Sequence, residues 1–273
     1  MADLADTFNT DDFTFHTGVS YRNLLVYRPQ TGGSPALFST ETGSTPPHDL
    51  IDMPVVGHLP TGPGAEVLCQ MMERSREVFI TADVDSRATQ TWLWGLGRRP
   101  GLDLFVERFG KTAAVVTAVD LVRGLGRLLG LSVIEVEGAT GKLDTDYTAK
   151  CQAAITALAE HDLVVVHVEA TDEASHDGDI AAKIEALERI DECIVGPLHD
   201  HLAGTGDHRI LVSPDHPTLL RTRTHAHDTV PVAACGTGLP LDGHLHYDEI
   251  TASDSSLLFE RGCDLVPWLF EIH

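Results

Sequence analysis

Hydrophobic residues in the second half of the chain form short runs that alternate with longer amphipathic segments. The short runs have the composition of buried strands and cover residues 112–117, 132–136, 163–168, 210–213 and 230–234. The longer segments repeat apolar residues at helical spacing and cover residues 119–129, 146–159 and 179–202. Strands that alternate with helices predict an α/β fold with a doubly wound, mostly parallel sheet.

The N-terminal part of the chain has a less regular pattern. Residues 20–27 end in β-forming side chains and predict a strand, whereas residues 64–76 have the apolar spacing of a helix. Between them, residues 29–63 are rich in Pro, Gly, Ser and Thr, which predicts a long loop region. Residues 92–101 have the turn-rich composition of a connector. The regular alternation of strands and helices therefore begins after this connector.

The composition is that of a globular protein with a sizeable core, since 42% of the 273 residues are hydrophobic. No segment approaches about 18 consecutive apolar residues, so we expect no membrane span. The acidic N-terminus lacks a signal-peptide pattern, and the five cysteines are dispersed without a CxxC pair. We therefore expect a cytoplasmic protein with reduced thiols.

The charge balance restricts the kind of partner. The chain carries 41 acidic and 19 basic residues, a net charge of −22. Such a surface repels nucleic acid and anionic lipid, so we expect neither nucleic acid nor a membrane as a partner. A phosphorylated substrate would need a locally cationic site.

Three segments supply side chains that could bind a metal ion. Asp172 and His176 follow one predicted strand, Asp215 and His216 follow another, and His225 comes from a third segment. In doubly wound sheets, ligands bind beyond the carboxyl ends of the strands. Carboxylates with imidazoles suit Mn²⁺, Zn²⁺ or Fe²⁺ better than Ca²⁺. The set is sufficient for one divalent ion and supplies part of a second site, and paired ions are common in phosphoryl transfer. The alternative is a group of surface histidines and helix-capping aspartates, in a chain that has 15 histidines.

A second group of residues could contact a substrate: Arg22, Arg123, Arg223, His48 and Asp49. Arginine can bind phosphate or carboxylate through two hydrogen bonds, although a solvated surface role is the alternative for each arginine. His48 and Asp49 lie in the Pro-rich loop region, where turn formation is the alternative. We find no GxSxG nucleophile motif and assign no catalytic nucleophile.

A series of motifs resembles one known family over nearly the whole chain. They cover residues 18–25, 46–49, 92–95, 118–121, 137–145, 167–179, 214–218, 223–225 and 253–267. In this order they resemble the archaeal-type cofactor-independent phosphoglycerate mutases of the alkaline phosphatase superfamily.

The resemblance implies a role for each predicted ligand. Asp172, His176 and His225 would bind one metal ion, whereas Asp215 and His216 would bind a second. An aspartate and a nucleophilic hydroxyl from the family's N-terminal segment would complete the second site. That hydroxyl would form a phosphoenzyme during the interconversion of 2- and 3-phosphoglycerate. Arg123 would bind substrate at a position where relatives usually carry lysine.

The N-terminal segment of the family is not found in this sequence. Residues 1–85 resemble part of the family's cap or substrate-binding region, and residues 86–273 resemble its metal-binding core. We therefore expect a truncated or split mutase with an incomplete second metal site, which a separate chain would complete if the protein is split. The alternatives are a non-catalytic metal-binding or regulatory remnant and a stand-alone metal-dependent phosphatase.

Overall fold

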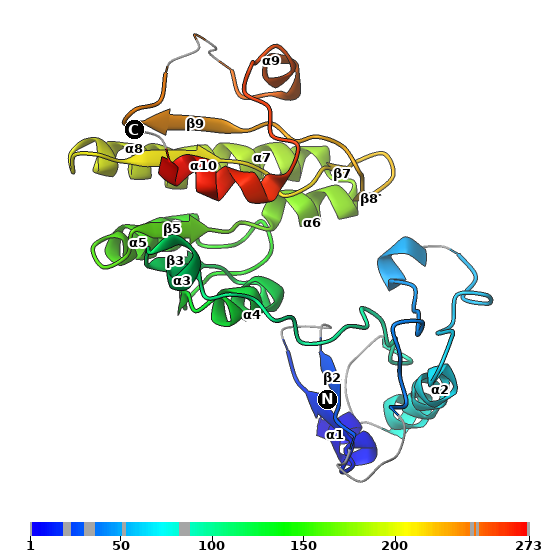
Figure 1. Ribbon diagram of the computed structural model, residues 1–273. Helices are drawn as coiled ribbons and strands as arrows, with labels where there is room; N and C mark the ends of the chain where they lie inside the picture. Colours follow the sequence, from blue (N-terminus) through cyan, green and yellow to red (C-terminus); the bar gives the residue numbers. More distant parts are fainter. Residues whose placement is uncertain are drawn as a thin grey trace. The chain divides into compact units, whose positions relative to one another are not determined.

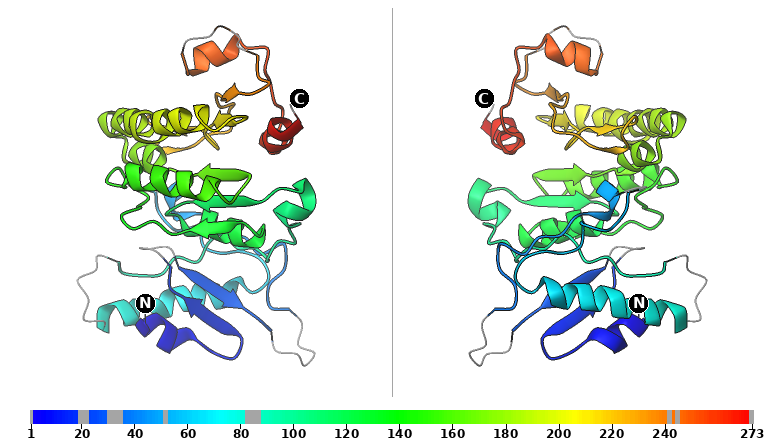
Figure 2. Two further views of the ribbon diagram at one scale, coloured as in Figure 1. Left: turned by 90° about the vertical axis from the view of Figure 1, so that its left-hand side faces the viewer. Right: turned by 90° about the vertical axis from the view of Figure 1, so that its right-hand side faces the viewer.

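The structure is a computed structural model that describes residues 2–18, 23–29, 36–50, 53–81, 88–240, 243 and 246–271. The chain divides into two compact units, Met1–Gly101 and Leu102–His273. Figures 1 and 2 show the helices and strands within each unit. The predicted division into residues 1–85 and 86–273 is a division by function, and it stays a prediction.

The first unit packs a short hairpin together with two helices. Its elements are α1 (Ala2–Phe8), β1 (Phe13–His16), β2 (Leu24–Tyr27), the 3₁₀ helix η1 (Pro47–Leu50) and α2 (Ala65–Thr81). Strands β1 and β2 pair in antiparallel fashion, with Phe13 opposite Tyr27. Leu68 and Met72 lie one turn apart on α2 and are buried. The helix predicted at 64–76 is confirmed, and it continues for a further turn.

The second unit begins with a parallel three-stranded sheet. Its first elements are α3 (Phe105–Phe109), β3 (Ala113–Val116), α4 (Asp120–Leu128), β4 (Ser132–Ile134), α5 (Tyr147–Leu158) and β5 (Leu163–Val166). Strand β3 lies between β4 and β5 and pairs in parallel with both. All of its side chains are buried, and both α4 and α5 pack against it. The predicted α/β class with a parallel sheet is therefore confirmed.

A run of helices follows β5: α6 (Ala170–Asp177), α7 (Ile180–Ile190), the π-helical segment η2 (Asp191–Val195) and α8 (Gly196–Ala203). The sequence predicts a single helix over residues 179–202, and the structure interrupts it with the π-helical segment. Pro197 accounts for the interruption, because proline offers no N–H to the preceding turn and its ring crowds the carbonyl of Cys193. The start of the helix is as predicted, since the Asp179 side chain accepts a hydrogen bond from the N–H of Ala182.

The remaining elements are β6 (Arg209–Val212), β7 (Thr218–Leu219), β8 (Thr224–His225), β9 (Ala233–Gly236), α9 (Glu249–Ser253), the 3₁₀ helix η3 (Gly262–Asp264) and α10 (Leu265–Glu271). Strands β6 and β9 pair in antiparallel fashion, and so do β7 and β8. The strand predicted at 230–234 begins later, at Ala233, because Pro231 has no N–H for a strand ladder. Within the described part of the chain, no helix is long and apolar enough to cross a membrane.

A buried cluster fixes the helices behind the candidate site. It joins α5, α6, α7 and the π-helical segment through Tyr147, Cys151, Ala170, Ala186 and Ile194. Ala170 and Ala186 are almost fully buried, and their small side chains let α6 and α7 approach each other closely. The position of α6 at the end of β5 is therefore set by close packing.

Candidate metal centre

Helix α6 carries the first two predicted ligands directly after β5. Asp172 and His176 are one turn apart, so their side chains lie on the same face of the helix. His176 Nε2 lies 3.3 Å from Asp172 Oδ2. The helix ends at Gly178, which adopts a left-handed conformation with φ 72°. Both side chains therefore face one point beyond the carboxyl end of β5.

The β7–β8 hairpin brings the second group of predicted ligands to this point. His225 lies on β8, and its Nε2 is 3.1 Å from His176 Nε2. The same atom is 3.5 Å from Asp172 Oδ1. The rings of His216 and His225 are 4.0 Å apart between centroids. Asp172, His216 and His225 each offer a ligand atom, and these atoms all lie within 4.8 Å of one another.

Asp215 lies at the exposed rim of the same cluster. Its Oδ2 is 3.4 Å from His216 Nε2, and its side chain is 79% exposed. Its Oδ1 accepts a hydrogen bond from the N–H of His216. The five predicted ligands thus gather in one place, with Asp215 the most open to solvent.

The ring tautomer of His176 is set by its neighbour on the hairpin. Its Nδ1 lies 2.8 Å from the carbonyl oxygen of Arg223. Because a carbonyl only accepts, Nδ1 carries a proton, and in the neutral ring Nε2 presents its lone pair to Asp172 and His225. A histidine that donates one ring N–H to a carbonyl and directs the other nitrogen inward is the usual form of a metal ligand. The donor set of carboxylate and imidazole groups therefore fits a divalent ion such as Mn²⁺ or Zn²⁺.

A buried polar group borders the centre on the side of the parallel sheet. Lys150 of α5 is 1% exposed, and its Nζ donates to the carbonyl oxygens of His167 and Thr140. Burial lowers the pKa of Lys150 to about 8, against the opposing effect of Glu169. Burial also lowers the pKa of His167, and Lys150 adds to this effect while Asp215 and Asp172 oppose it.

Lys150 is not among the site residues predicted from the sequence. Its signal is spacing, because Lys150 shares the buried face of α5 with Tyr147 and Ala154. A lysine on an apolar helical face needs buried acceptors for its N–H groups, and here two carbonyl oxygens supply them.

The predicted substrate residues fall into different parts of the structure. Arg123 of α4 lies at the carboxyl end of β3, where its Nε donates to the carbonyl of Thr117. Its Nη1 is 3.5 Å from Asp120 Oδ1. His48 and Asp49 belong to η1 of the first unit. Arg22 lies outside the described residues.

Arg223 lies beside the metal centre in an unusual conformation. Its φ is 56°, the only positive value at a non-glycine position among the described residues. A Cβ atom added to Gly178 would meet the Nε of Arg223 at 2.7 Å, so the guanidinium group lies directly over Gly178. Arg223 therefore orients His176 through its carbonyl and places a positive charge near the same ligands.

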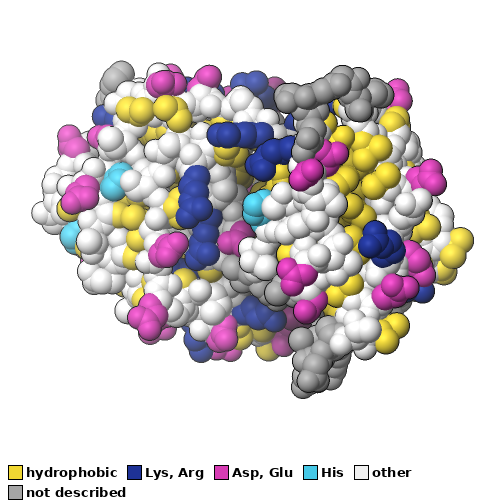
Figure 3. All heavy atoms as spheres, turned by 90° about the horizontal axis from the view of Figure 1, so that it is seen from below, with side chains coloured by type: hydrophobic (Ala, Val, Ile, Leu, Met, Phe, Trp, Pro, Cys, Tyr) yellow, Lys and Arg dark blue, Asp and Glu magenta, His cyan; other side chains and the backbone are white. Residues whose placement is uncertain are grey.

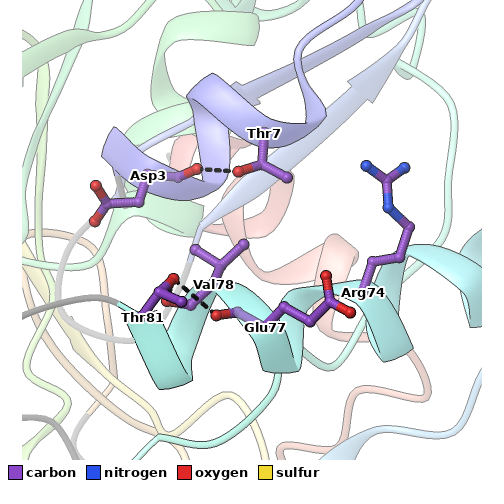
Figure 4. Close-up of a pocket in the computed structure, with 6 residues that line it drawn as sticks. All are labelled: Asp3, Thr7, Arg74, Glu77, Val78 and Thr81. Carbon is purple, nitrogen blue, oxygen red and sulfur yellow. Dashed lines mark hydrogen bonds between the residues drawn. The ribbon is translucent and has the colours of Figure 1, made fainter.

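Among the described residues, no second group of three or more His, Cys, Asp or Glu side chains is placed to hold a metal ion. A pocket of about 340 Å³ lies between α1 and α2 in the first unit, and Figure 4 shows the side chains that line it. Its lining residues are Asp3, Thr7, Arg74, Glu77, Val78 and Thr81. The hydroxyls of Thr7 and Thr81 already donate to carbonyls of their own helices. On the face shown in Figure 3, acidic side chains are spread out with basic ones among them.

Comparisons with known proteins show which family the chain resembles. Residues 41–253 match the Metalloenzyme superfamily. The chain is 42% identical over 263 residues to the 2,3-bisphosphoglycerate-independent phosphoglycerate mutase of Methanothrix thermoacetophila, covering 93% of this chain and 65% of that protein. It is 38% identical over 279 residues to the enzyme of the same name from Methanosarcina acetivorans, covering 98% of this chain and 68% of that protein.

A solved structure resembles the whole chain. The cofactor-independent phosphoglycerate mutase from Thermoplasma acidophilum superposes with a TM-score of 0.51 at 23% identity, covering 94% of this chain and 65% of that one. The chain thus spans about two thirds of the length of its relatives. These matches confirm the family resemblance and the alkaline phosphatase-like fold. The chain belongs to the Metalloenzyme superfamily and, within it, to the family of 2,3-bisphosphoglycerate-independent phosphoglycerate mutases.

Proposed function

We propose that this chain carries the metal-binding part of a phosphoglycerate mutase that interconverts 2- and 3-phosphoglycerate. The observation that carries the proposal is the convergence of Asp172, His176 and His225 beside His216, in a chain of this family. Asp172, His176 and His225 would hold one ion, and Asp215 and His216 would belong to a second, incomplete site. Mn²⁺ and Zn²⁺ are the ions that the donor set favours.

Two arginines, Arg123 and Arg223, would orient the metal ligands and the substrate. The carbonyl of Arg223 keeps the Nε2 lone pair of His176 directed at the centre. Arg123 and Arg223 would bind the negative charges of the substrate, a role that their guanidinium geometry suits. A bound metal would supply positive charge that stabilises the transferring phosphoryl group and lowers the pKa of a nucleophilic hydroxyl. A cytoplasmic location is our expectation from the dispersed cysteines.

Metal binding by variants of the full chain tests the ligand assignment. We expect one tight Mn²⁺ or Zn²⁺ equivalent and a weaker second one in calorimetric titrations of the wild-type chain. Asp172→Asn and His176→Ala should abolish the tight equivalent, because each removes a ligand of the first ion. The controls are Asp200→Asn and His199→Ala on α8, whose side chains are largely exposed and lie beside each other. Unchanged stoichiometry in the Asp172 and His176 variants would contradict the assignment.

An enolase-coupled assay with 3-phosphoglycerate separates the possible activities. The residues assigned above include no nucleophile, so we expect no turnover by residues 1–273 alone. We expect turnover when the N-terminal segment of a relative is added in a separate chain. Release of inorganic phosphate by the isolated chain would instead favour a stand-alone phosphatase. Metal binding without any turnover in either mixture would favour a non-catalytic metal-binding protein.

A further inference from the structure

Thr218, which is not one of the predicted ligands, lies among them at the start of β7. Its side chain is 7% exposed. The hydroxyl donates a hydrogen bond to Asp172 Oδ1, and it lies 3.3 Å from His216 Nδ1. One buried hydroxyl thus connects a ligand assigned to the first ion with a ligand assigned to the second.

The directions of these two hydrogen bonds follow from the chemistry of the groups. A threonine hydroxyl has one proton, and an ionised carboxylate can only accept, so the proton points to Asp172. The contact with His216 then requires Nδ1–H to donate to the hydroxyl oxygen. In the neutral ring this tautomer leaves the lone pair on His216 Nε2, 3.4 Å from a carboxylate oxygen of Asp215. A nitrogen lone pair and a carboxylate oxygen at this distance attract a cation between them.

Three elements hold Thr218 in this position. Its hydroxyl bonds to α6 through Asp172, and its carbonyl accepts a hydrogen bond of 3.2 Å from Lys183 Nζ of α7. On the hairpin, Thr218 lies opposite His225 in the β7–β8 pairing. Its position is therefore fixed against all the segments that carry predicted ligands.

We propose that Thr218 is a positioning residue that orients Asp172 and sets the ring tautomer of His216 for metal binding. This inference rests on one part of the proposed function, namely that the predicted ligands bind a metal ion. The hydroxyl restrains the Asp172 carboxylate and selects the His216 tautomer whose Nε2 is free to bind. Lys183 supports Thr218 through its carbonyl.

Mn²⁺ titration of four full-length chains tests the proposal: wild type, Thr218→Val, Thr218→Ser and Thr224→Val. Valine keeps the shape of threonine without the hydroxyl, and we expect it to weaken Mn²⁺ binding by about 10- to 100-fold. Serine restores the hydroxyl and should bind Mn²⁺ like the wild type. Thr224 is a matched control in the same hairpin, since its hydroxyl bonds to Thr222. Wild-type affinity in Thr218→Val would overturn the proposal, whereas a wild-type chain that binds no Mn²⁺ would overturn the proposed function as well.

A second measurement, of the His216 ring tautomer, needs no metal ion. Nitrogen-15 NMR of the histidine rings in the metal-free protein should show His216 with its proton on Nδ1 in the wild type and in Thr218→Ser. Thr218→Val should lose this preference. If Thr218→Val does not fold, Lys183→Met replaces it, and we expect weaker Mn²⁺ binding and a smaller change in the same direction. An unchanged His216 tautomer in the folded variant would overturn the proposal.

Discussion

One residue at the candidate metal centre, Arg223, adopts a conformation that is unfavourable elsewhere. Arg223 has a positive φ without being glycine, and it combines a carbonyl that binds His176 with a guanidinium group over Gly178. Conformational strain of this kind persists only where surrounding contacts fix it, and it is frequent at functional sites. The strain at Arg223 is consistent with a residue whose position serves the ligands.

A Gly178→Ala variant tests whether the contact between Gly178 and the Arg223 guanidinium group affects substrate binding. Gly178 and Gly110 are both left-handed C-caps, with φ 72° and 62°. A Cβ at Gly110 meets nothing within 4 Å, whereas at Gly178 it meets the guanidinium group of Arg223. We expect both alanine variants to lose about 1–2 kcal/mol of unfolding free energy in urea titrations. Only Gly178→Ala should also weaken 3-phosphoglycerate binding by the metal-loaded chain. Equal binding by both variants would argue against a substrate role for Arg223.

At the scale of elements, the centre depends on how helices join the ends of strands. Helix α5 reaches the end of β5 through Lys150, whose Nζ bonds to the carbonyls of His167 and Thr140. The amine is enclosed and its charge is poorly solvated, which explains its lowered pKa. This junction should therefore make stability depend on pH.

Comparison of the wild type with Lys150→Met tests this dependence. The folded pKa of Lys150 is about 8, below its ordinary value of 10.5. Below pH 8 the amine is protonated in both states, so the unfavourable burial of its charge is fully present. Between pH 8 and pH 10.5 the unfolded state binds more protons, so folding stability rises with pH, by roughly 3 kcal/mol in all.

Urea unfolding with chelator, measured at steps from pH 7 to 10.5, gives the required values. The unfolding free energy of the wild type should rise relative to that of Lys150→Met over this range. A constant difference between the two chains would show that the amine is not titrating in the folded state. The variant also controls for other groups that titrate in the same range, because it retains all of them.

At the scale of the whole molecule, the dominant property is the net charge of −22. Acidic side chains are spread over the face shown in Figure 3 and do not form a single patch there. Repulsion among like charges opposes the compact state at low ionic strength. Salt shortens the range of this repulsion.

We therefore expect the thermal unfolding midpoint to rise when NaCl is increased from about 10 mM to about 200 mM, since the Debye length falls below about 10 Å. Differential scanning calorimetry of the metal-free chain measures this shift. KCl should have the same effect at equal concentration, because screening does not depend on the identity of the ion. A midpoint that falls or stays constant would contradict the argument.

Much of the fold could be predicted from local patterns. The strands at 112–117 and 163–168 are short apolar runs, and their parallel pairing in the structure follows from the helices between them. Asp179 begins α7 as its capping chemistry predicts. The exceptions arise from single prolines, since Pro197 interrupts a predicted helix and Pro231 delays a predicted strand. Proline acts through one missing N–H, which a hydrophobic pattern does not record.

The sequence by itself determined the α/β class, the family and the five candidate ligands, because each depends on residue types in a local pattern. Only the tertiary structure brought Asp172 together with His225, since the helices and strands between them could be arranged in many ways and their proximity depends on the packing of α6 against the β7–β8 hairpin. The tertiary structure also revealed Thr218 and Lys150. Their roles come from buried hydrogen bonds to distant residues, and such partners leave no periodic signal along the chain.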